Sequence, residues 1–188
     1  ASGGYSTKNA SIAYWSSPII HYIIIIFMII SGTNFSLLYG AIVRRQGKKL
    51  IRDEEFRTYV ISLIIVALTI FVGLMATRNI ENWGDAEKSF RDATFQTIAT
   101  ITTTGFSSSD YMTWHPILWF IILLLIPLGA SAGSTSGGVK IIRIHIILKN
   151  IYYEFKRVMH PKAIRPVRVN KRIISENTLS NTYVFLSI

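Results

Sequence analysis

One short polar run carries the residue types best suited to chemistry in this chain. It reads Ile101-Thr102-Thr103-Thr104-Gly105-Phe106-Ser107 and lies between strongly apolar segments. Backbone that is neither helical nor part of a closed barrel is tolerated at membrane depth only where protein buries it or where it lines a watery path. In one such use, an ion filter, the carbonyl oxygens of an extended strand replace the water shell of a cation. Threonine favours extended backbone and glycine allows close approach, so this run, here called the filter strand, predicts a cation site.

The same pattern opens the chain, in residues 1–6. Aligning Gly4 with Gly105 matches Ala-Ser-Gly-Gly-Tyr-Ser to the Thr-Thr-Thr-Gly-Phe-Ser of residues 102–107. Two copies about a hundred residues apart indicate an internal repeat. A proline, an apolar segment, a glycine and basic residues then follow in the same order: Pro18, Gly32 and Arg44 after the first copy, and Pro116, Gly129 and Lys140 after the second. A threonine-rich turn in an outer loop would explain one copy but not two.

A run of ten small residues interrupts the apolar sequence after the second copy. The apolar segment from Ile117 to Leu128 is too short to cross a bilayer, and apolar sequence resumes from Val139 to Phe155. The insert between them, here called the gate loop, consists of Gly129, Ala130, Ser131, Ala132, Gly133, Ser134, Thr135, Ser136, Gly137 and Gly138. Discontinuous helices of this kind mark ion or substrate sites in transporters. Close helix packing also uses small residues, but the run exceeds what packing needs, and we interpret it as a mobile gate.

Other kinds of chemistry fit the sequence less well. A phosphate-binding loop at residues 133–140 would need a Gly-Lys-Ser/Thr order and a preceding strand, and it has neither. A serine hydrolase would be built on Ser131 or Ser134. Its base would be His115 or His145, but no carboxylate lies near either serine in the sequence and no nucleophile elbow is present. Metal-ligand spacing is absent among the four histidines, which are His21, His115, His145 and His160.

Composition and charge indicate a membrane protein. Half of the residues (50%) are hydrophobic and only 16% are charged, so a soluble domain is the less favoured class. The net charge of +10 could indicate nucleic-acid binding. However, sixteen of the twenty Lys and Arg lie in residues 44–57 or 140–172, beside apolar segments, which is typical of cytoplasmic loops. We therefore expect no nucleic-acid partner. Because cysteine is absent, disulfides and thiolate metal sites are excluded.

Three helical elements are expected to position the filter strand. Apolar spans from Pro18 to about Tyr39 and from Phe56 to about Met75 are long enough to cross a hydrocarbon core of roughly 30 Å. The segment from Ala86 to Ile101 is too short and too polar to span, and it ends at the filter strand. A re-entrant pore helix has these properties and directs its negative dipole end toward the cation path. Since the chain starts without methionine within one repeat and ends in what looks like a new span, we expect a fragment of a longer protein.

With these residues in place, the chain resembles the Trk/Ktr/HKT superfamily of potassium transporters, and within it the bacterial Trk-type uptake subunits. The resemblance rests on Thr103-Thr104-Gly105-Phe106, on Gly129 to Lys140 with its Gly-Ser-Thr-Ser-Gly-Gly core, and on Ser31-Gly-Thr-Asn-Phe35. It implies an all-α membrane protein with pseudo-fourfold repeats of helix, re-entrant pore helix with filter loop, and helix. This fragment would cover about two of those repeats.

The resemblance also implies a division of the chain. The expected parts are residues 1–44, the end of the second pore repeat (filter loop and inner helix); 45–58, a cytoplasmic loop; 59–155, the third pore repeat (outer helix, pore helix, filter and broken inner helix); 156–179, a basic cytoplasmic linker; and 180–188, the start of the fourth repeat.

The site residues follow from the same likeness. The implied ion filter consists of Ser2, Gly3, Gly4, Tyr5, Thr102, Thr103, Thr104, Gly105 and Phe106. Potassium would bind at Ser2, Gly3, Thr103 and Thr104. The filter departs from the Thr-Val-Gly-Tyr-Gly of potassium channels, because Ser107 replaces the second glycine and Gly3-Gly4 replaces Val-Gly in the other copy. Fewer well-formed ion sites are therefore expected.

The implied function is potassium uptake across the bacterial inner membrane, through a carbonyl-lined filter gated by the loop at residues 129–138. Potassium is the substrate, no covalent cofactor is needed, and the protein is not an enzyme. The expected partners are a cytoplasmic nucleotide-binding regulatory subunit, a second copy in a homodimer, and membrane lipids. The alternatives are the membrane-embedded serine hydrolase described above and a membrane scaffold without transport.

Overall fold

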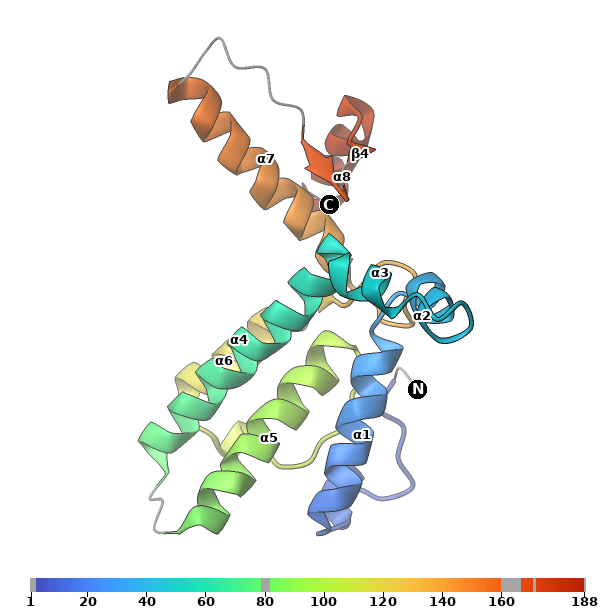
Figure 1. The fold of residues 1–188 in the computed structure, drawn as a ribbon. Helices are drawn as coiled ribbons and strands as arrows, with labels where there is room; N and C mark the ends of the chain where they lie inside the picture. Colours follow the sequence, from blue (N-terminus) through green and yellow to red (C-terminus); the bar gives the residue numbers. More distant parts are fainter. Residues whose placement is uncertain (1–2, 79–81, 160–166, 171, 188) are drawn as a thin grey trace.

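The helix that leads into the filter strand lies at the centre of the fold. The computed structural model describes residues 3–78, 82–159, 167–170 and 172–187. The central helix, α5 (Trp83–Ile101), contacts α1 (Pro18–Ser31), α4 (Glu54–Thr77) and α6 (Pro116–Leu125), as Figure 1 shows. Most of its second half is buried in a hydrophobic core that includes the fully buried Phe95. A polar helix is thus enclosed by three apolar ones.

The outward faces of α1, α4 and α6 are apolar and exposed. The exposed large side chains include Ile19, Ile23, Ile26 and Phe27 on α1, Ile61, Ile64, Ile65, Leu68 and Val72 on α4, and Ile117, Phe120, Leu123 and Leu124 on α6. Only 22% of the most apolar window of α4 is buried within the chain, whereas the core helix of a soluble protein is mostly buried. Apolar surface of this extent indicates contact with a membrane or with further protein. Within the described ranges, α4 alone is long and apolar enough to span a membrane by itself.

The prediction of one continuous span from Pro18 to about Tyr39 is wrong. The helix α1 ends at Ser31, and α2 (Phe35–Ile42) leaves it at an angle of 106°. Asn34 starts the new helix, because its side chain accepts hydrogen bonds from the N–H groups of the second and third residues of α2, at 2.9 and 3.4 Å. A run of apolar residues does not by itself distinguish a straight span from one that is interrupted by a helix cap.

Buried polar side chains connect α5 to α1. Arg91 donates to Glu87 through Nε (3.1 Å) and Nη2 (3.3 Å), and its Nη1 lies 3.2 Å from Nδ1 of His21. Because arginine only donates, Nδ1 of His21 accepts, and its Nε2–H donates to the carbonyl of Trp15 at 2.9 Å. The Tyr22 hydroxyl donates to the same Glu87 carboxylate at 2.9 Å. This network restricts the rotation of the central helix relative to α1.

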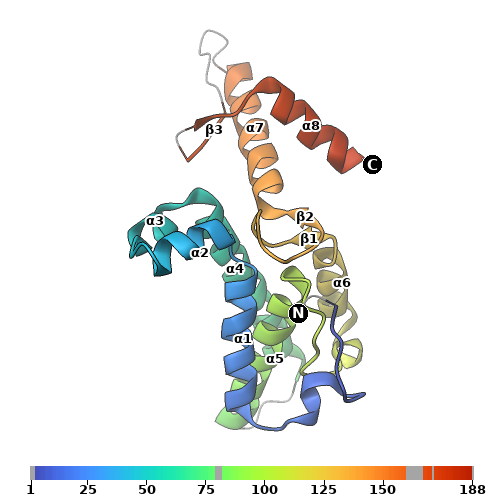
Figure 2. The same cartoon turned by 90° about the vertical axis from the view of Figure 1, so that its right-hand side faces the viewer.

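The second inner helix is interrupted, as predicted. The helix α6 ends at Leu125, and α7 (Ile141–Met159) begins after the gate loop. Between them β1 (Leu128–Gly129) and β2 (Val139–Lys140) pair in parallel. Figure 2 shows this pair closing the loop between α6 and α7, near the end of α5.

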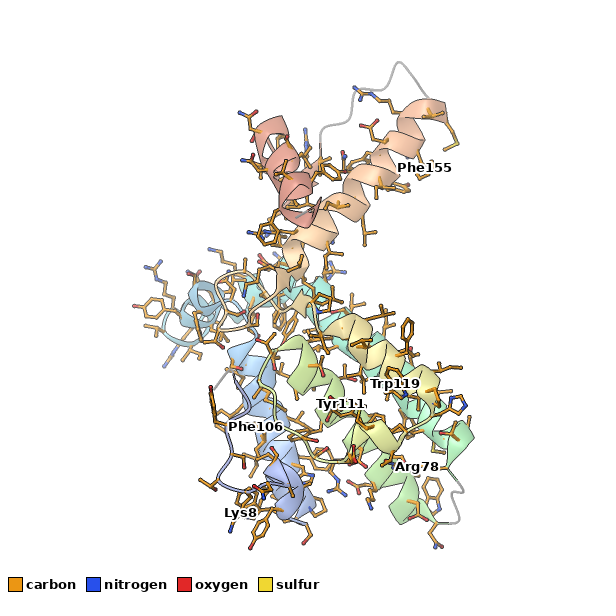
Figure 3. The ribbon with its side chains drawn as sticks, turned by 180° about the vertical axis from the view of Figure 1, so that it is seen from behind. Lys8, Arg78, Phe106, Tyr111, Trp119 and Phe155 are labelled. Carbon is orange, nitrogen blue, oxygen red and sulfur yellow. The ribbon has the colours of Figure 1, made fainter. Side chains whose placement is uncertain are left out.

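The remaining elements are short. They are η1 (Ser11–Tyr14), α3 (Gly47–Arg52), η2 (Tyr111–Thr113), the antiparallel pair β3 (Arg168–Val169) and β4 (Arg172–Ile173), and α8 (Glu176–Ser187). Figure 3 shows Lys8 and Arg78 at the end of the molecule opposite to Phe155. Helices dominate the described residues, which confirms the predicted all-α class.

Candidate ion filter and gate

The filter strand begins as the cap of α5. The helix ends in a Schellman motif, in which the N–H of Thr104 donates to the carbonyl of Ala99 (2.9 Å) and the N–H of Thr103 donates to that of Thr100 (3.0 Å). Thr103 occupies the left-handed position of this motif with φ +51°, where glycine is usual and a β-branched residue is strained. Left-handed backbone costs an ordinary residue roughly 1–2 kcal/mol. A threonine at this position therefore needs a compensating contact.

From Thr102 to Gly105 the N–H groups of the filter strand are bonded, whereas most of the carbonyl oxygens are not. Each N–H from Thr102 to Gly105 donates to a carbonyl in the last turns of α5. Among the described residues, no donor contacts the carbonyl oxygens of Thr102, Thr103 or Gly105. The backbone also alternates in hand, with φ −80° at Thr102, +51° at Thr103, a negative value at Thr104 and +77° at Gly105. The carbonyl oxygens without a protein donor are the groups of this strand that could contact a cation.

The first copy of the pattern lies against the filter strand. The N–H of Gly3 donates to the carbonyl of Thr104 at 3.3 Å, and two N–H groups of η1 donate to the carbonyl of Ser107, both at 3.1 Å. Gly4 has φ +67°, similar to the +77° of Gly105, with which the sequence alignment pairs it. A Cβ on Gly4 would overlap the carbonyl oxygen of Gly105. The two backbones are therefore in direct contact, with no room for a side chain between them.

Three of the four predicted potassium-binding residues come together here. Gly3, Thr103 and Thr104 belong to this pair of backbones, and Ser2 lies outside the described residues. Gly105 is exposed rather than covered by protein. A cavity of ≈ 410 Å³ borders the strand, lined by residues of α5, the filter strand and α6. The strand thus has one side on the protein core and one open side.

The predicted filter side chains divide into two groups. The Thr102 hydroxyl donates to the carbonyl of Ile98 (2.7 Å) and lies 2.8 Å from the Thr104 hydroxyl, and both threonines are buried. These two hydroxyls therefore hold the filter strand against the last turn of α5. Phe106 also packs against the core around α5, whereas its counterpart Tyr5 is 92% exposed. The filter strand is thus better supported than the first copy.

The gate loop is closed on itself, and Ser136 is at the centre of its hydrogen bonds. The Ser136 hydroxyl accepts from the N–H of Ala130 (3.0 Å) and lies 2.8 Å from the Ser134 hydroxyl. The Lys140 ammonium donates to the same hydroxyl at 3.0 Å and also to the Ser136 carbonyl. A Cβ on Gly129 would overlap the carbonyl oxygen of Gly137. The small residues are therefore required for this closed form, in addition to any mobility that they provide.

The gate loop is attached to the break between α1 and α2. The N–H of Ser131 donates to the carbonyl of Gly32 and the N–H of Phe35 donates to the carbonyl of Gly133, both at 3.1 Å. The Thr135 hydroxyl donates to the last carbonyl of α1 at 3.3 Å. Two breaks that are distant in the sequence are thus joined.

Two further contacts connect the loop to α4 and to the filter strand. The carboxylate of Glu55, at the start of α4, accepts from the N–H of Ala132 and is only 7% exposed. The N–H of Gly137 donates to the Thr103 hydroxyl at 2.7 Å. This second contact offsets part of the strain at Thr103, and it links the gate loop directly to the filter strand.

Sequence reasoning did not identify Glu55 or Asn34 as parts of this arrangement. Glu55 follows Glu54 at the start of an apolar span, where acidic residues commonly stabilise a helix N-terminus. An acidic residue at this position therefore does not by itself predict a contact with the gate loop. Asn34 did carry a specific signal, because an asparagine before a helical segment is an N-cap signal. That signal was obscured by the apolar residues on both sides.

The residues of the alternative hydrolase do not meet. Ser131 is fully buried, and the Ser134 hydroxyl donates to the Ser131 carbonyl at 2.6 Å. His145 lies 3.6 Å from Glu54, and His115 caps α6. Neither histidine contacts a serine of the loop. Within the described ranges, no three His, Asp or Glu side chains gather as a metal site would require.

Relatives match this chain along its whole length. A protein-family model described as "TrkH: Cation transport protein" matches residues 1–188. The chain is 35% identical over 188 residues to the Trk system potassium uptake protein TrkH of Salmonella typhimurium, covering 100% of this chain and 38% of that protein. It is 29% identical over 187 residues to the Trk system potassium uptake protein TrkG of Escherichia coli, covering 97% of this chain and 37% of that protein.

A solved structure is also similar. The crystal structure of the potassium transporter TrkH from Vibrio parahaemolyticus matches with a TM-score of 0.89 at 31% identity, covering 98% of this chain and 39% of that one. The chain therefore spans less than two fifths of the length of these relatives.

Proposed function

This chain belongs to the TrkH family of cation transport proteins, and we propose that it forms part of a transmembrane pathway for potassium uptake. Carbonyl oxygens of the filter strand and of Ser2, Gly3 and Gly4 replace water around a passing potassium ion. The gate loop, below the filter, controls access from the cytoplasm. Its relatives are named potassium uptake proteins, and the substrate in this proposal comes from those names.

The observation that carries the proposal is the set of unpaired carbonyls on the filter strand. The carbonyl oxygens of Thr102, Thr103 and Gly105 contact no donor among the described residues, while the N–H groups from Thr102 to Gly105 are all bonded. A strand in a sheet would pair both kinds of group. A row of carbonyls beside an exposed glycine supports dehydration of a cation instead.

The gate in this proposal is the closed loop at residues 129–138. Its direct contact with Thr103, at 2.7 Å from the N–H of Gly137, supports a position at the inner end of the filter. Opening would require the loop to release its bonds to Glu55 and to the break after α1. The basic residues of α3 and α7 favour the cytoplasm for this end of the molecule.

We propose two related pore repeats within the chain. Residues 1–44 supply the end of one repeat and residues 59–155 supply the whole of the next. Residues 45–58 connect them in the cytoplasm, and residues 156–179 lead to a further repeat that starts in residues 180–188. The matching φ values of the two aligned filter glycines support this division.

The partners of the whole transporter are also proposals. Since the relatives are named as parts of a Trk system, we propose a cytoplasmic nucleotide-binding subunit that controls the gate, and a homodimer as the assembly. The proposed location is the bacterial inner membrane, as a multi-pass protein.

The direct test substitutes one filter glycine, Gly105, in the full-length protein. Gly105 has φ +77°, and a Cβ there would lie 3.0 Å from the backbone nitrogen of Gly4. Gly105→Ala should abolish rubidium uptake into proteoliposomes while membrane insertion is unchanged. Gly84→Ala is the matched control, because a Cβ on Gly84 meets nothing within 4 Å. Normal rubidium uptake by Gly105→Ala would exclude a filter at this position.

A further inference from the structure

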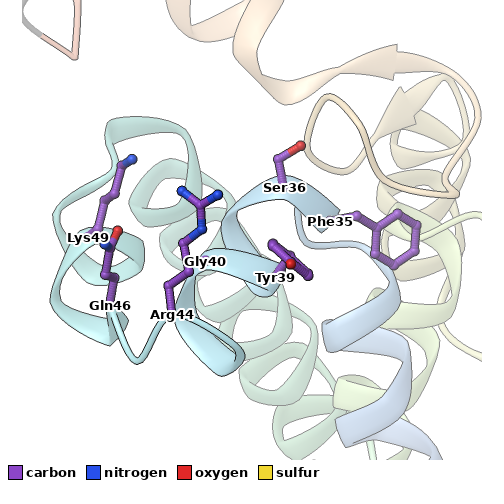
Figure 4. Close-up of a pocket in the computed structure, with 7 residues that line it drawn as sticks. All are labelled: Phe35, Ser36, Tyr39, Gly40, Arg44, Gln46 and Lys49. Carbon is purple, nitrogen blue, oxygen red and sulfur yellow. The ribbon is translucent and has the colours of Figure 1, made fainter.

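A basic pocket lies in the hairpin of α2 and α3, outside the filter and the gate loop. Its volume is ≈ 420 Å³, and its lining residues are Phe35, Ser36, Tyr39, Gly40, Arg44, Gln46 and Lys49. Figure 4 shows the Arg44 guanidinium and the Lys49 ammonium directed to the same side of the hairpin as the Ser36 hydroxyl. The pocket thus combines two cations and a hydroxyl with the ring of Tyr39, while the ring of Phe35 points away from the cations.

The charge of the hairpin is strongly one-sided. Residues 35–52 contain no Asp or Glu, and their basic residues are Arg44, Arg45, Lys48, Lys49 and Arg52. Within the part of the chain that the structure describes, none of these five side chains forms an ion pair with a carboxylate. A cluster of cations without protein counter-ions attracts anions. The ligand of the pocket is therefore expected to be anionic.

The apolar side of the hairpin favours a membrane surface. Because α2 leaves α1 at 106°, it lies nearly parallel to the membrane plane when α1 crosses the membrane. Phe35, Tyr39 and Ile42 recur at helical spacing on one face of α2, and their exposed fractions are 49%, 58% and 73%. An apolar face next to basic residues is typical of helices that lie in the headgroup layer.

We propose that this pocket binds the phosphate headgroup of an anionic phospholipid from the cytoplasmic leaflet. Arg44 and Lys49 contact the phosphate, while the ring of Tyr39 contacts the glycerol and the upper acyl chain. Inorganic phosphate would use only the polar lining, whereas a lipid uses both parts. The first residue of α2, Phe35, donates to the carbonyl of Gly133, so a bound lipid would stabilise the helix to which the gate loop is attached. The inference rests on the membrane location in the proposed function, but not on ion conduction.

The first test removes the two pocket cations from the full-length protein. Native mass spectrometry in detergent would measure phosphatidylglycerol binding to R44Q/K49Q and to the matched control R45Q/K48Q, which has the same charge loss in the same hairpin. Each cation near an anionic lipid contributes about fivefold to binding, so R44Q/K49Q should lose on the order of 25-fold in affinity. The control should lose clearly less, because its two side chains do not line the pocket.

The second test fills the pocket without changing its charge. Gly40 lines the pocket, and a Cβ there meets nothing within 4 Å. Leucine also favours helix more than glycine does, so Gly40→Leu should fold normally and reduce phosphatidylglycerol binding severalfold. Unchanged lipid binding in this variant would contradict the proposal.

Three further outcomes would overturn the assignment. Equal losses in R44Q/K49Q and R45Q/K48Q would mean a diffuse basic surface instead of a site. Displacement of phosphatidylglycerol by an equal concentration of inorganic phosphate would mean a free phosphate site. If R44Q/K49Q kept its lipid but lost binding of an acidic cytoplasmic protein, the pocket would be a protein docking surface.

Discussion

The two inner helices break at corresponding points of the proposed repeat, but by different means. Only residues 32–34 separate α1 from α2, whereas residues 126–140 separate α6 from α7. The short break has little freedom, because the Thr33 hydroxyl donates to the carbonyl of Ile29 at 2.9 Å and Asn34 caps the next helix. The long break instead closes through bonds within its own loop and to neighbouring elements. One break is thus fixed by local contacts, and the other is held by contacts to neighbouring elements, which the proposed gating would have to release.

The difference assigns separate tasks to the two breaks. The short break and the helix ends beside it present two carbonyls and one N–H that bind the gate loop, through Ser131, Gly133 and Thr135. A hydrogen bond of this kind contributes about 1 kcal/mol net, so the attachment contributes about 3 kcal/mol to the closed form. Moving a two-state equilibrium from 1:99 to 99:1 requires roughly 5.5 kcal/mol of differential binding. The attachment is smaller than this value, so a partner with a moderate preference for the open form could release it.

The largest expected effect distinguishes the glycines of the two breaks. Gly129→Ala places a Cβ on the carbonyl oxygen of Gly137, whereas Gly32→Ala places one on the hydroxyl of Tyr59. The Gly137 carbonyl is part of the backbone and cannot move aside as the Tyr59 side chain can. Gly129→Ala should therefore destabilise the closed loop by about 3 kcal/mol or more. Rubidium leak in proteoliposomes should rise as a result. Gly32→Ala should also be destabilised, and Tyr59→Phe should restore only part of its thermal stability, because a Cβ on Gly32 would also lie 2.9 Å from Cγ2 of Thr102.

The controls for this comparison use the same readouts. Gly84→Ala should match the wild type in thermal unfolding and leak, because its Cβ has open space. If Gly129→Ala behaved like Gly84→Ala, the closed loop would not be the resting form of the protein.

The next effect concerns the buried attachment of the long break to α4. Glu55→Ala leaves the N–H of Ala132 without its acceptor, and the loss of a buried bond to a charged group costs about 2 kcal/mol. Leak flux should therefore rise. Glu55→Gln keeps a neutral acceptor and should have a smaller effect. Glu54→Gln is the control, because Glu54 pairs with Lys149 and does not touch the loop. Equal leak from the Glu54 and Glu55 variants would exclude a specific role for Glu55.

The sequence predicted the broken inner helix and missed the bent one for a physical reason. Ten consecutive small residues cannot continue an apolar helix in lipid, so composition alone indicated the long break. At the short break only Gly32, Thr33 and Asn34 depart from an otherwise apolar run. The turn there depends on a side-chain cap, and hydropathy does not register a cap.

The candidate site could be predicted only where local pattern determines it. The repeated glycine pattern indicated the filter strand, and Gly4 and Gly105 do lie in contact. The contact of Glu55 with Ala132 joins residues 77 positions apart, and no local pattern carries such a pairing. The left-handed φ of Thr103 was equally invisible, because the motif that imposes it normally takes glycine.

A smaller effect is expected from the cap of the short break. Asn34→Ala removes the acceptor of two N–H groups at the start of α2, which should cost about 1 kcal/mol of stability. Thermal unfolding of the full-length protein in detergent would measure it, and Asn34→Asp should retain most of the stability. His115 caps α6 through one longer contact of 3.4 Å, so His115→Ala should cost less than Asn34→Ala. The reverse order would mean that the bend after α1 does not depend on its cap.

The smallest effect tests whether the long break is coupled to the filter. The N–H of Gly137 donates to the Thr103 hydroxyl, whereas no hydrogen bond joins Gly32 or Asn34 to residues 3–6 in the described part of the chain. Thr103→Ser keeps the hydroxyl and Thr103→Ala removes it, while both variants lose the β-methyl group. Because Gly137 is exposed and water can replace the bond, the hydroxyl contributes about 1 kcal/mol or less to closure. Thr103→Ala should therefore raise rubidium leak severalfold above Thr103→Ser, and equal leak from the two variants would show that the loop closes independently of the filter strand.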